Sequence, residues 1–336
     1  MIVGMSTPAR FLRQSPLAAV ATLMLLSAFL PEVCSGNTLA SAFLTPKVFI
    51  FLVIVGYGIP VLLVRELAIG KGLGTAGILI AGFAYGSYNE GLWAKTMIAT
   101  GDVPIPAFNH YGELLGIAVP WAMLISMWHA LASVLFPIVF THALFPDQRN
   151  KPWLDVRLAL GLAGAALALG SFAFLQPFKQ PGTPVQLAIF LTVIVGGASV
   201  ATRFKRPERP ETRPAGAWPV LLGLSVLAPF AGQILLAVAK VPVGLFVAAL
   251  IGAVGAYAAI VTALRWQDPP NLTLFGLGFY IETLFVSAGL RVAAGKAPIE
   301  SAVVAAVLGA AFIWAAFRIN ARPKPGASEA PLAAYR

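Results

Sequence analysis

Charged side chains are scarce in this sequence. Of its 336 residues, 11% are charged and 59% are apolar or aromatic, whereas an ordinary soluble domain has about 25% charged residues. The mean hydropathy is +0.84. This composition excludes a soluble globular protein, a disordered chain and a nucleic-acid-binding protein. The net charge of +10 must then be explained by where the basic residues lie.

Cysteine, cofactor motifs and a signal-peptide cleavage site are also missing. Cys34 is the only cysteine, so the chain cannot form an intrachain disulfide. We find no phosphate loop, nucleotide fingerprint, haem motif or iron–sulfur motif, and therefore expect no cofactor. The spacing of histidines and carboxylates fits no standard zinc pattern, so we expect no metal. No small-x-small pattern follows the apolar run 17–30, which favours an uncleaved first span.

Long apolar runs are abundant. A helix needs about 20 mostly apolar residues to cross a bilayer, and no run shows the alternation of a barrel strand. The sequence therefore predicts an all-α, polytopic integral membrane bundle of about ten transmembrane helices. The expected spans are 16–31, 47–65, 73–95, 115–141, 157–175, 185–203, 217–239, 242–264, 271–291 and 298–317.

The basic residues predict the orientation of these spans. If the N-terminus is cytoplasmic, 17 of the 23 lysines and arginines lie on the cytoplasmic side and six on the other. This is the positive-inside asymmetry of membrane proteins. We therefore expect both termini in the cytoplasm and a location in a bacterial-type inner membrane.

Polarity divides the chain into four segments. Residues 1–202 hold spans one to six and most of the polar residues, and residues 217–320 hold the other four spans. Residues 203–216 form a basic, Pro-rich cytoplasmic linker, and residues 321–336 are expected to be a disordered tail. The basic cluster at 203–213 either anchors the topology or binds anionic lipid headgroups.

Glu90 lies within an apolar span, where an ionisable group is costly and usually functional. Gly82, Gly86 and Glu90 are four residues apart and share one helix face. Glycines at this spacing allow a neighbouring helix to approach closely, so we expect Glu90, beside Asn89, to face the interior of the bundle. A proton-handling or catalytic role, substrate contact and an ion pair with Lys95 are the alternatives.

His129 lies in span 115–141, beside a face of small and polar residues. It either packs through hydrogen bonds or contributes to function. If Pro120 occupies the first turn of this helix, His129 is near the midplane, offset from Glu90 by roughly 10 Å in depth. The two residues then meet only if span 73–95 starts late, is tilted or is broken.

Further polar residues extend this candidate set. Glu282 lies near the midplane on a glycine-containing face, where it relays protons or cations or is hydrogen-bonded to a neighbour. The outer loop after Glu90 carries His110 and Glu113, and Glu32, at the outer end of the first span, could join them. The candidate substrate or proton pathway comprises Asn89, Glu90, His110, Glu113, His129 and Glu282.

The stretch Asn-Glu-Gly-Leu-Trp at 89–93, followed by His129, resembles the CAAX-protease and bacteriocin-processing family of glutamic intramembrane proteases. That family carries Glu-Glu-x-x-x-Arg, then Phe-x-x-x-His, then His-x-x-x-Asn. Glu90 matches the second Glu and His129 the second-motif His, whereas Asn89 replaces the first Glu and no histidine follows His142. The resemblance implies that Glu90 activates a water for peptide hydrolysis and that His129 supports it.

Three functions remain open on this reasoning. The first is a transporter or permease for a small or lipid-like substrate, ion-coupled through buried glutamates, since cutting near residue 180 leaves five spans on each side, as in inverted repeats. The second is an intramembrane hydrolase with Glu90 as general base and His129 as partner. The third is a non-catalytic membrane scaffold or assembly protein. The span count places transport first. A Glu90–His129 separation above about 8 Å, with no water between the two residues, would exclude the hydrolase.

Overall fold

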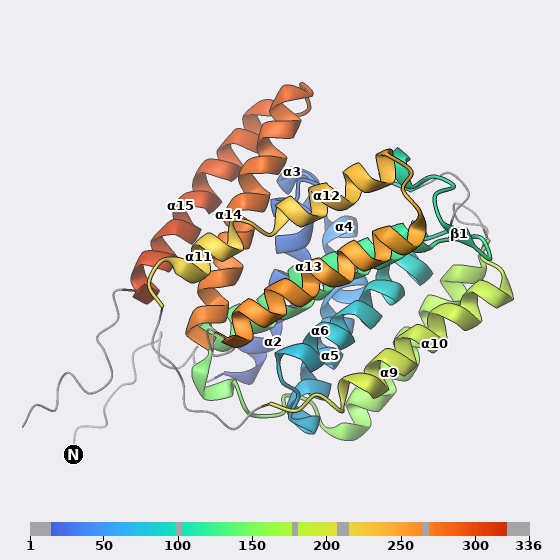
Figure 1. The fold of residues 1–336 in the computed structure, drawn as a ribbon. Coiled ribbons are helices and arrows are strands. Elements are labelled where there is room, and N and C mark those ends of the chain that lie inside the picture. The colour runs from blue at the N-terminus through green and yellow to red at the C-terminus, as the bar shows by residue number, and fades with distance from the viewer. Residues whose placement is uncertain (1–14, 99–102, 177–180, 207–214, 264–268, 321–336) are drawn as a thin grey trace, which may run out of the picture.

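A computed structural model describes residues 15–98, 103–176, 181–206, 215–263 and 269–320, and these residues are almost entirely helical (Figure 1). The sheet among them is one antiparallel pair, β1 (Glu113–Leu114) and β2 (Ile117–Ala118). The predicted all-α membrane bundle is confirmed. The expected tail 321–336 and most of the linker, residues 207–214, lie outside the described residues.

The helices follow the expected spans closely. The short helices are α3 (Ala40–Phe43), η4 (Pro106–Phe108) and η6 (Pro146–Gln148). The others are α2 (Pro16–Phe29), η1 (Leu30–Cys34), α4 (Pro46–Ile50), η2 (Phe51–Gly56), α5 (Gly58–Lys71), α6 (Thr75–Gly86), η3 (Ser87–Trp93), α7 (Val119–His129), η5 (Ala130–Leu135), α8 (Phe136–Leu144), α9 (Val156–Leu175), α10 (Pro184–Ala201), α11 (Trp218–Gly223), α12 (Leu227–Val238), α13 (Val243–Ala263), α14 (Pro269–Ala293) and α15 (Pro298–Asn320).

Nine helices of the described chain are long and apolar enough to cross a membrane. Each corresponds to one of the ten expected spans. The tenth, expected at 73–95, is formed by α6 and η3, which carry the polar run 87–90 and lie inside the bundle. A count of about ten helices is therefore consistent with the structure.

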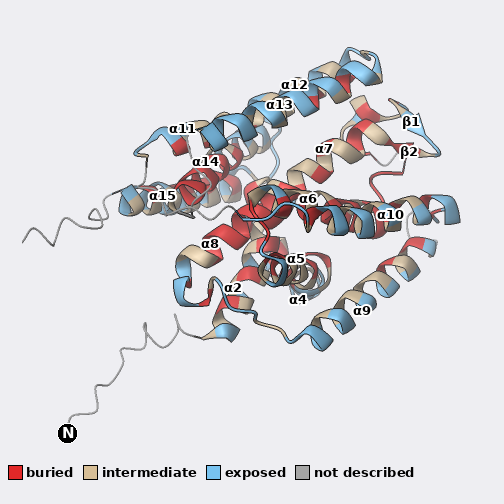
Figure 2. Cartoon of the chain, turned by 60° about the horizontal axis from the view of Figure 1, so that its bottom comes forward, coloured by how far each residue is buried: buried red, intermediate tan, exposed pale blue. Residues whose placement is uncertain are grey.

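The helices differ strongly in burial (Figure 2). In the most apolar stretch of the span α7–η5–α8, 72% of the residues are buried, and in that of α14 the share is 67%. The corresponding share is only 11–17% in α9, α10, α13 and α15. The core therefore lies around α5, α6, α7–α8 and α14, and the peripheral helices present apolar side chains to the surroundings, as lipid-facing helices do.

Four of the buried spans contain a π-helical segment, namely η1, η2, η3 and η5. A π turn holds one more residue than an α turn. Such turns are rare in proteins overall, and those that occur are often found at functional sites. All four segments of the described chain lie before residue 136, in the first four spans. This concentration marks the amino-terminal part of the bundle as structurally unusual.

Glycines on α6 bring it against α7 and η5. A Cβ at Gly82 would lie 2.8 Å from Ala130 Cα, and one at Gly86 would lie 2.5 Å from Ser126 Cα. Only glycine permits this backbone approach, as the four-residue spacing predicts. The two helices thus run side by side, and their polar faces meet.

Candidate functional site

The centre of the site is a hydrogen-bonded pair, Glu90 and His129. Glu90 Oε1 lies 2.9 Å from His129 Nε2, and His129 Nδ1 lies 2.7 Å from Ser133 Oγ. The His129 side chain is 2% exposed and that of Glu90 is 14% exposed. Both ring nitrogens are therefore engaged inside the bundle, and Glu90 is the member that reaches the surface.

The two residues meet because their side chains lean toward each other. The contacts of Gly82 and Gly86 pair α6 and α7 antiparallel, with His129 about seven residues deeper than Glu90, or roughly 10 Å. Each Cα–Cβ bond in a helix tilts toward that helix's N-terminus. In an antiparallel pair the two tilts point in opposite directions. The side chains of Glu90 and His129 therefore lean toward each other and span the difference in depth between their backbones.

Thr96 and Trp121 hold the other side of the carboxylate. The Thr96 hydroxyl donates a short hydrogen bond to Glu90 Oε2, and Trp121 Nε1 donates to Thr96 Oγ1 at 3.1 Å. A donor chain thus runs from the indole through the hydroxyl to the carboxylate. This arrangement fixes the carboxylate plane and directs one oxygen to His129.

The Gly56 carbonyl, at the end of η2, binds two site residues. It accepts hydrogen bonds from the Tyr85 hydroxyl at 2.9 Å and from Asn89 Nδ2 at 3.1 Å. Asn89 Nδ2 also lies 2.7 Å from the Tyr85 hydroxyl. The residue four positions after Gly56 is Pro60, which has no N–H, so the carbonyl lacks its usual intrahelical donor and side chains take that place. Asn89 is therefore held one residue before Glu90.

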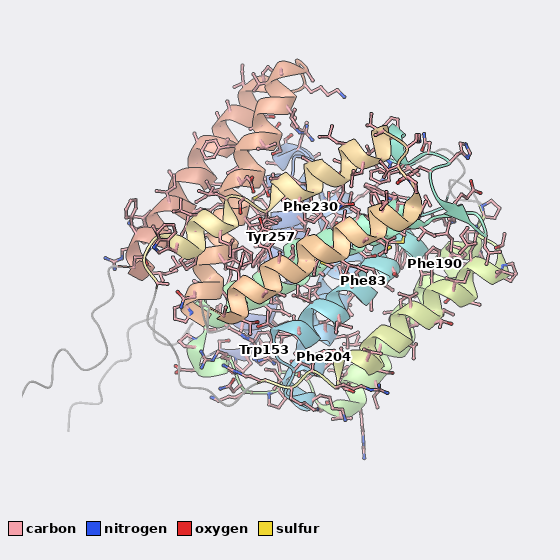
Figure 3. The ribbon with its side chains drawn as sticks, in the orientation of Figure 1. Phe83, Trp153, Phe190, Phe204, Phe230 and Tyr257 are labelled. Atoms are coloured by element: carbon pink, nitrogen blue, oxygen red, sulfur yellow. The ribbon has the colours of Figure 1, made fainter. Side chains whose placement is uncertain are left out.

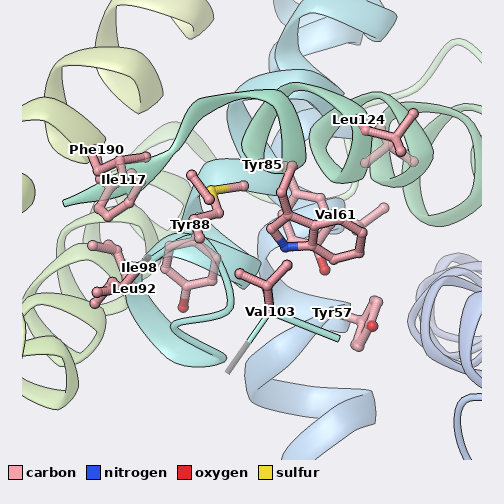
Figure 4. Close-up of a cluster of buried hydrophobic side chains, with 14 of the residues drawn as sticks. Tyr57, Val61, Tyr85, Tyr88, Leu92, Ile98, Val103, Ile117, Leu124 and Phe190 are labelled. Carbon is pink, nitrogen blue, oxygen red and sulfur yellow. The ribbon is translucent and has the colours of Figure 1, made fainter. Parts of the chain in front are cut away.

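A second carboxylate, Glu32 of η1, lies across an aromatic layer from His129. Tyr57 donates to Glu32 Oε1 at 2.5 Å, and Asn37 Nδ2 donates to Glu32 Oε2 at 2.7 Å. The Tyr57 and Tyr85 rings lie 5.9 and 5.6 Å from the His129 ring. Figure 4 shows both tyrosines among the buried side chains of this region. Tyrosine rings thus separate the two carboxylate clusters.

The other sequence candidates lie elsewhere. Glu282 Oε2 accepts a hydrogen bond from the backbone N–H of Leu227 at 2.9 Å, where the span containing α11 and α12 is broken. His110 Nδ1 and Glu113 Oε2 lie 3.3 Å apart on an exposed loop. Of the six candidate residues, Asn89, Glu90 and His129 come together, and the other three do not join them.

Sequence reasoning missed Tyr57, Tyr85 and Thr96. Ser133, four residues after His129, belongs to the small and polar face that the sequence places beside His129. Tyr57 reaches the site only through tertiary packing. Thr96 lies in the turn after η3, six residues from Glu90, and the helical pattern does not extend to it. Glu32 does lie with polar neighbours, but it approaches His129 through Tyr57 rather than joining His110 and Glu113.

Within the described residues, no three His, Cys, Asp or Glu side chains are grouped closely enough to hold a metal ion. A model described as an uncharacterized membrane protein family matches residues 21–321. No curated protein and no solved structure matches the chain.

Proposed function

The chain belongs to this uncharacterized membrane protein family, and from its geometry we propose that it is an intramembrane hydrolase with Glu90 as general base and His129 as its partner. The observation that carries the proposal is the 2.9 Å contact between Glu90 and His129. A general base and its partner must lie within hydrogen-bond reach, about 2.6–3.2 Å.

Burial and hydrogen bonding give the two residues different roles. Glu90 is the more exposed member of the pair, so it meets water and substrate. His129 is enclosed and bonded on both ring nitrogens, which fixes the ring. In one tautomer, Nε2–H donates to the Glu90 carboxylate and Nδ1 accepts from the Ser133 hydroxyl. The pair therefore shares a proton that can move between carboxylate and imidazole.

The proposed reaction is attack of water on a carbonyl carbon. Glu90 takes a proton from the water, and the resulting hydroxide adds to the carbonyl. The proton then returns through the Glu90–His129 pair to the leaving group as the bond to it breaks. Thr96 keeps the carboxylate oriented during both transfers. The resemblance of Glu90 and His129 to glutamic intramembrane proteases favours a peptide bond as the bond cleaved.

The geometry supports hydrolysis better than the transport ranked first from the span count. A relay for an ion-coupled transporter would need Glu282 and His129 on one path. Glu282 instead lies at the break between α11 and α12. It contacts the backbone N–H of Leu227, and an amide N–H does not give up its proton to a carboxylate. Glu90, by contrast, contacts an imidazole, a group that can donate and accept a proton.

The test compares membranes from cells that lack the protein with membranes from cells supplied with wild type, E90Q or H129Q. Peptides and lipids are extracted and quantified by mass spectrometry. We expect at least one species to be cleaved only with the wild type, and both variants to match the cells that lack the protein. H110Q and E113Q are matched controls in the exposed loop and should restore the cleavage.

Two results would contradict the hydrolase. An E90Q variant that restores the wild-type composition would favour a scaffold. A compound that changes only its side of the membrane, and is chemically unaltered, would favour transport. The detergent-purified variants must show the wild-type melting temperature, so that loss of cleavage is separated from loss of folding.

A further inference from the structure

An elongated apolar cavity lies away from the Glu90 centre, between α6–α7–η5 and α12–α13. Its volume is about 240 Å³. An apolar cavity of about 150 Å³ already stays dry and binds a molecule of benzene size. Its walls are formed by side chains of α6, α7, η5, α12, α13 and α14, among them Leu131, Phe230, Leu250 and Tyr257. Figure 3 labels Phe230 and Tyr257 between α12 and α13.

The cavity has the shape of a chain rather than of a compact ligand. Along α13 its lining extends from Leu250 to Thr262, twelve residues or roughly 18 Å of helix. One end is at Gly74, Thr75 and Lys205, on the side that the basic residues predict to be cytoplasmic. The other end reaches Leu250, near the middle of α13.

Two polar side chains deep in the wall, Gln233 and Tyr257, already have hydrogen-bond partners. With its amide oriented to serve both groups, Gln233 donates to the Phe246 carbonyl at 3.3 Å and accepts from Leu250 N at 3.1 Å. The Tyr257 hydroxyl bonds to the Ser225 carbonyl and hydroxyl, both at 2.8 Å. Water in a cavity needs two to four polar partners, so these walls favour a hydrocarbon occupant.

The mouth of the cavity is positively charged. Lys205 lies there, between Arg203 and Arg206, and its exposed ammonium group donates one hydrogen bond to the Lys71 carbonyl at 2.8 Å. The first turn of α6 begins at the same place, and its N-cap, Gly74, supplies no side-chain acceptor. A helix N-terminus and a lysine together attract an anionic group such as a phosphate.

From these features we propose that the cavity binds one acyl chain of an anionic phospholipid, with the phosphate at Lys205 and the first turn of α6. The membrane supplies both parts of this ligand. The proposal gives Lys205, at the start of the basic linker, a specific role beyond setting topology. It does not depend on the hydrolase, because neither Glu90 nor His129 lines the cavity.

The test is native mass spectrometry of the full chain with phosphatidylglycerol or with phosphatidylcholine carrying the same acyl chains. We expect the wild type to retain one phosphatidylglycerol more strongly than phosphatidylcholine. A253F places a ring in the cavity and should lower retention of both lipids at least about fivefold, an effect of about 1 kcal/mol. A256F, on the exposed side of α13 outside the lining, is the matched control and should bind like the wild type.

The headgroup is tested separately with K205Q, which keeps a hydrogen-bond donor and removes the charge. It should reduce the preference for phosphatidylglycerol severalfold, whereas K151Q, an exposed lysine on the same predicted side, should not. Unchanged retention in A253F would overturn the cavity as the binding site. Unchanged preference in K205Q would overturn the assigned position of the phosphate.

Discussion

The regions around Glu90 and Glu282 look alike in sequence and differ in structure. Each carboxylate lies in an apolar span on a face that contains glycine. Glu90 accepts hydrogen bonds from an imidazole and a hydroxyl, whereas Glu282 accepts one from the backbone N–H of Leu227. An imidazole can accept a proton from a carboxylate or return one to it, whereas a backbone amide keeps its proton. The partner of a carboxylate inside the bundle therefore indicates its role better than its depth does.

The glycines also act differently in the two regions. Around Glu90 they let α6 approach α7, and two polar faces meet. Around Glu282 a Cβ at Gly278 would lie 2.2 Å from the Val220 carbonyl oxygen, and one at Gly223 would lie 2.2 Å from that of Phe275. There α11 and α14 touch backbone to backbone just before the break. Glu282, one turn along α14, then holds the first turn of α12.

The largest predicted effect separates the two carboxylates by activity. E90Q should lower the cleavage rate about 100-fold or more, as expected for loss of a general base. E282Q should stay within about twofold of the wild type, because glutamine keeps an oxygen that accepts the Leu227 hydrogen bond. The measurement is the rate at which the species found in the membrane comparison is cleaved. Equal losses of cleavage rate in E90Q and E282Q would show that the two carboxylates do not differ in role.

The second prediction concerns η2, whose last residue, Gly56, binds Tyr85 and Asn89 through its carbonyl. A Cβ at Gly58 would lie 1.9 Å from the Val53 carbonyl oxygen, so G58A must reshape η2 and should cost about 3 kcal/mol. The midpoint of unfolding in denaturant measures it in detergent. The control is G232A in α12, where the space is open, and it should stabilise by about 0.5 kcal/mol. A G58A protein as stable as wild type would contradict the role of glycine there.

The third prediction measures the structural role of Glu282. E282A removes the acceptor at the start of α12 and should destabilise by about 1 kcal/mol, as loss of an N-cap does. E282Q should cost about half as much, because an uncharged oxygen still accepts the bond. Thermal unfolding of the purified protein in detergent measures both. Two equal, negligible shifts would show that the carboxylate is not a helix cap.

The smallest effect is predicted for the outer loop. His110 and Glu113 form an exposed pair at 3.3 Å, and exposed pairs contribute less than about 1 kcal/mol. H110Q should change the melting temperature by less than about 2 °C and leave the cleavage rate unaltered. A large loss of activity in H110Q would show instead that this loop belongs to the same functional site as Glu90.

Much of the helical arrangement could be predicted because it depends on local properties. Apolar runs of sufficient length become helices in a membrane, since the backbone has no other way to satisfy its hydrogen bonds. The interior face of α6 followed from the spacing of Gly82, Gly86 and Glu90, a consequence of helical periodicity. The span at 217–239 was expected to be unbroken, and its break between α11 and α12 was not foreseen.

The site could be predicted only in part. Asn89, Glu90 and His129 were identified because polar residues in apolar spans need an explanation. Glu282 carried the same signal and lies elsewhere. Tyr57 and Thr96 were missed because neither is unusual for its local sequence. Tyr57 joins the site through a contact across helices, and Thr96 through the turn that folds back on Glu90 after η3.

By itself the sequence determined a helical membrane bundle and which carboxylates lie within its apolar spans, because hydrophobicity and helical periodicity are local. Only the tertiary structure decided which partner each carboxylate has. That choice depends on the antiparallel approach of α6 and α7, on the opposed tilt of their side chains, and on the Gly56 carbonyl, which binds Tyr85 and Asn89. These are relations between helices distant in sequence, which no single stretch encodes.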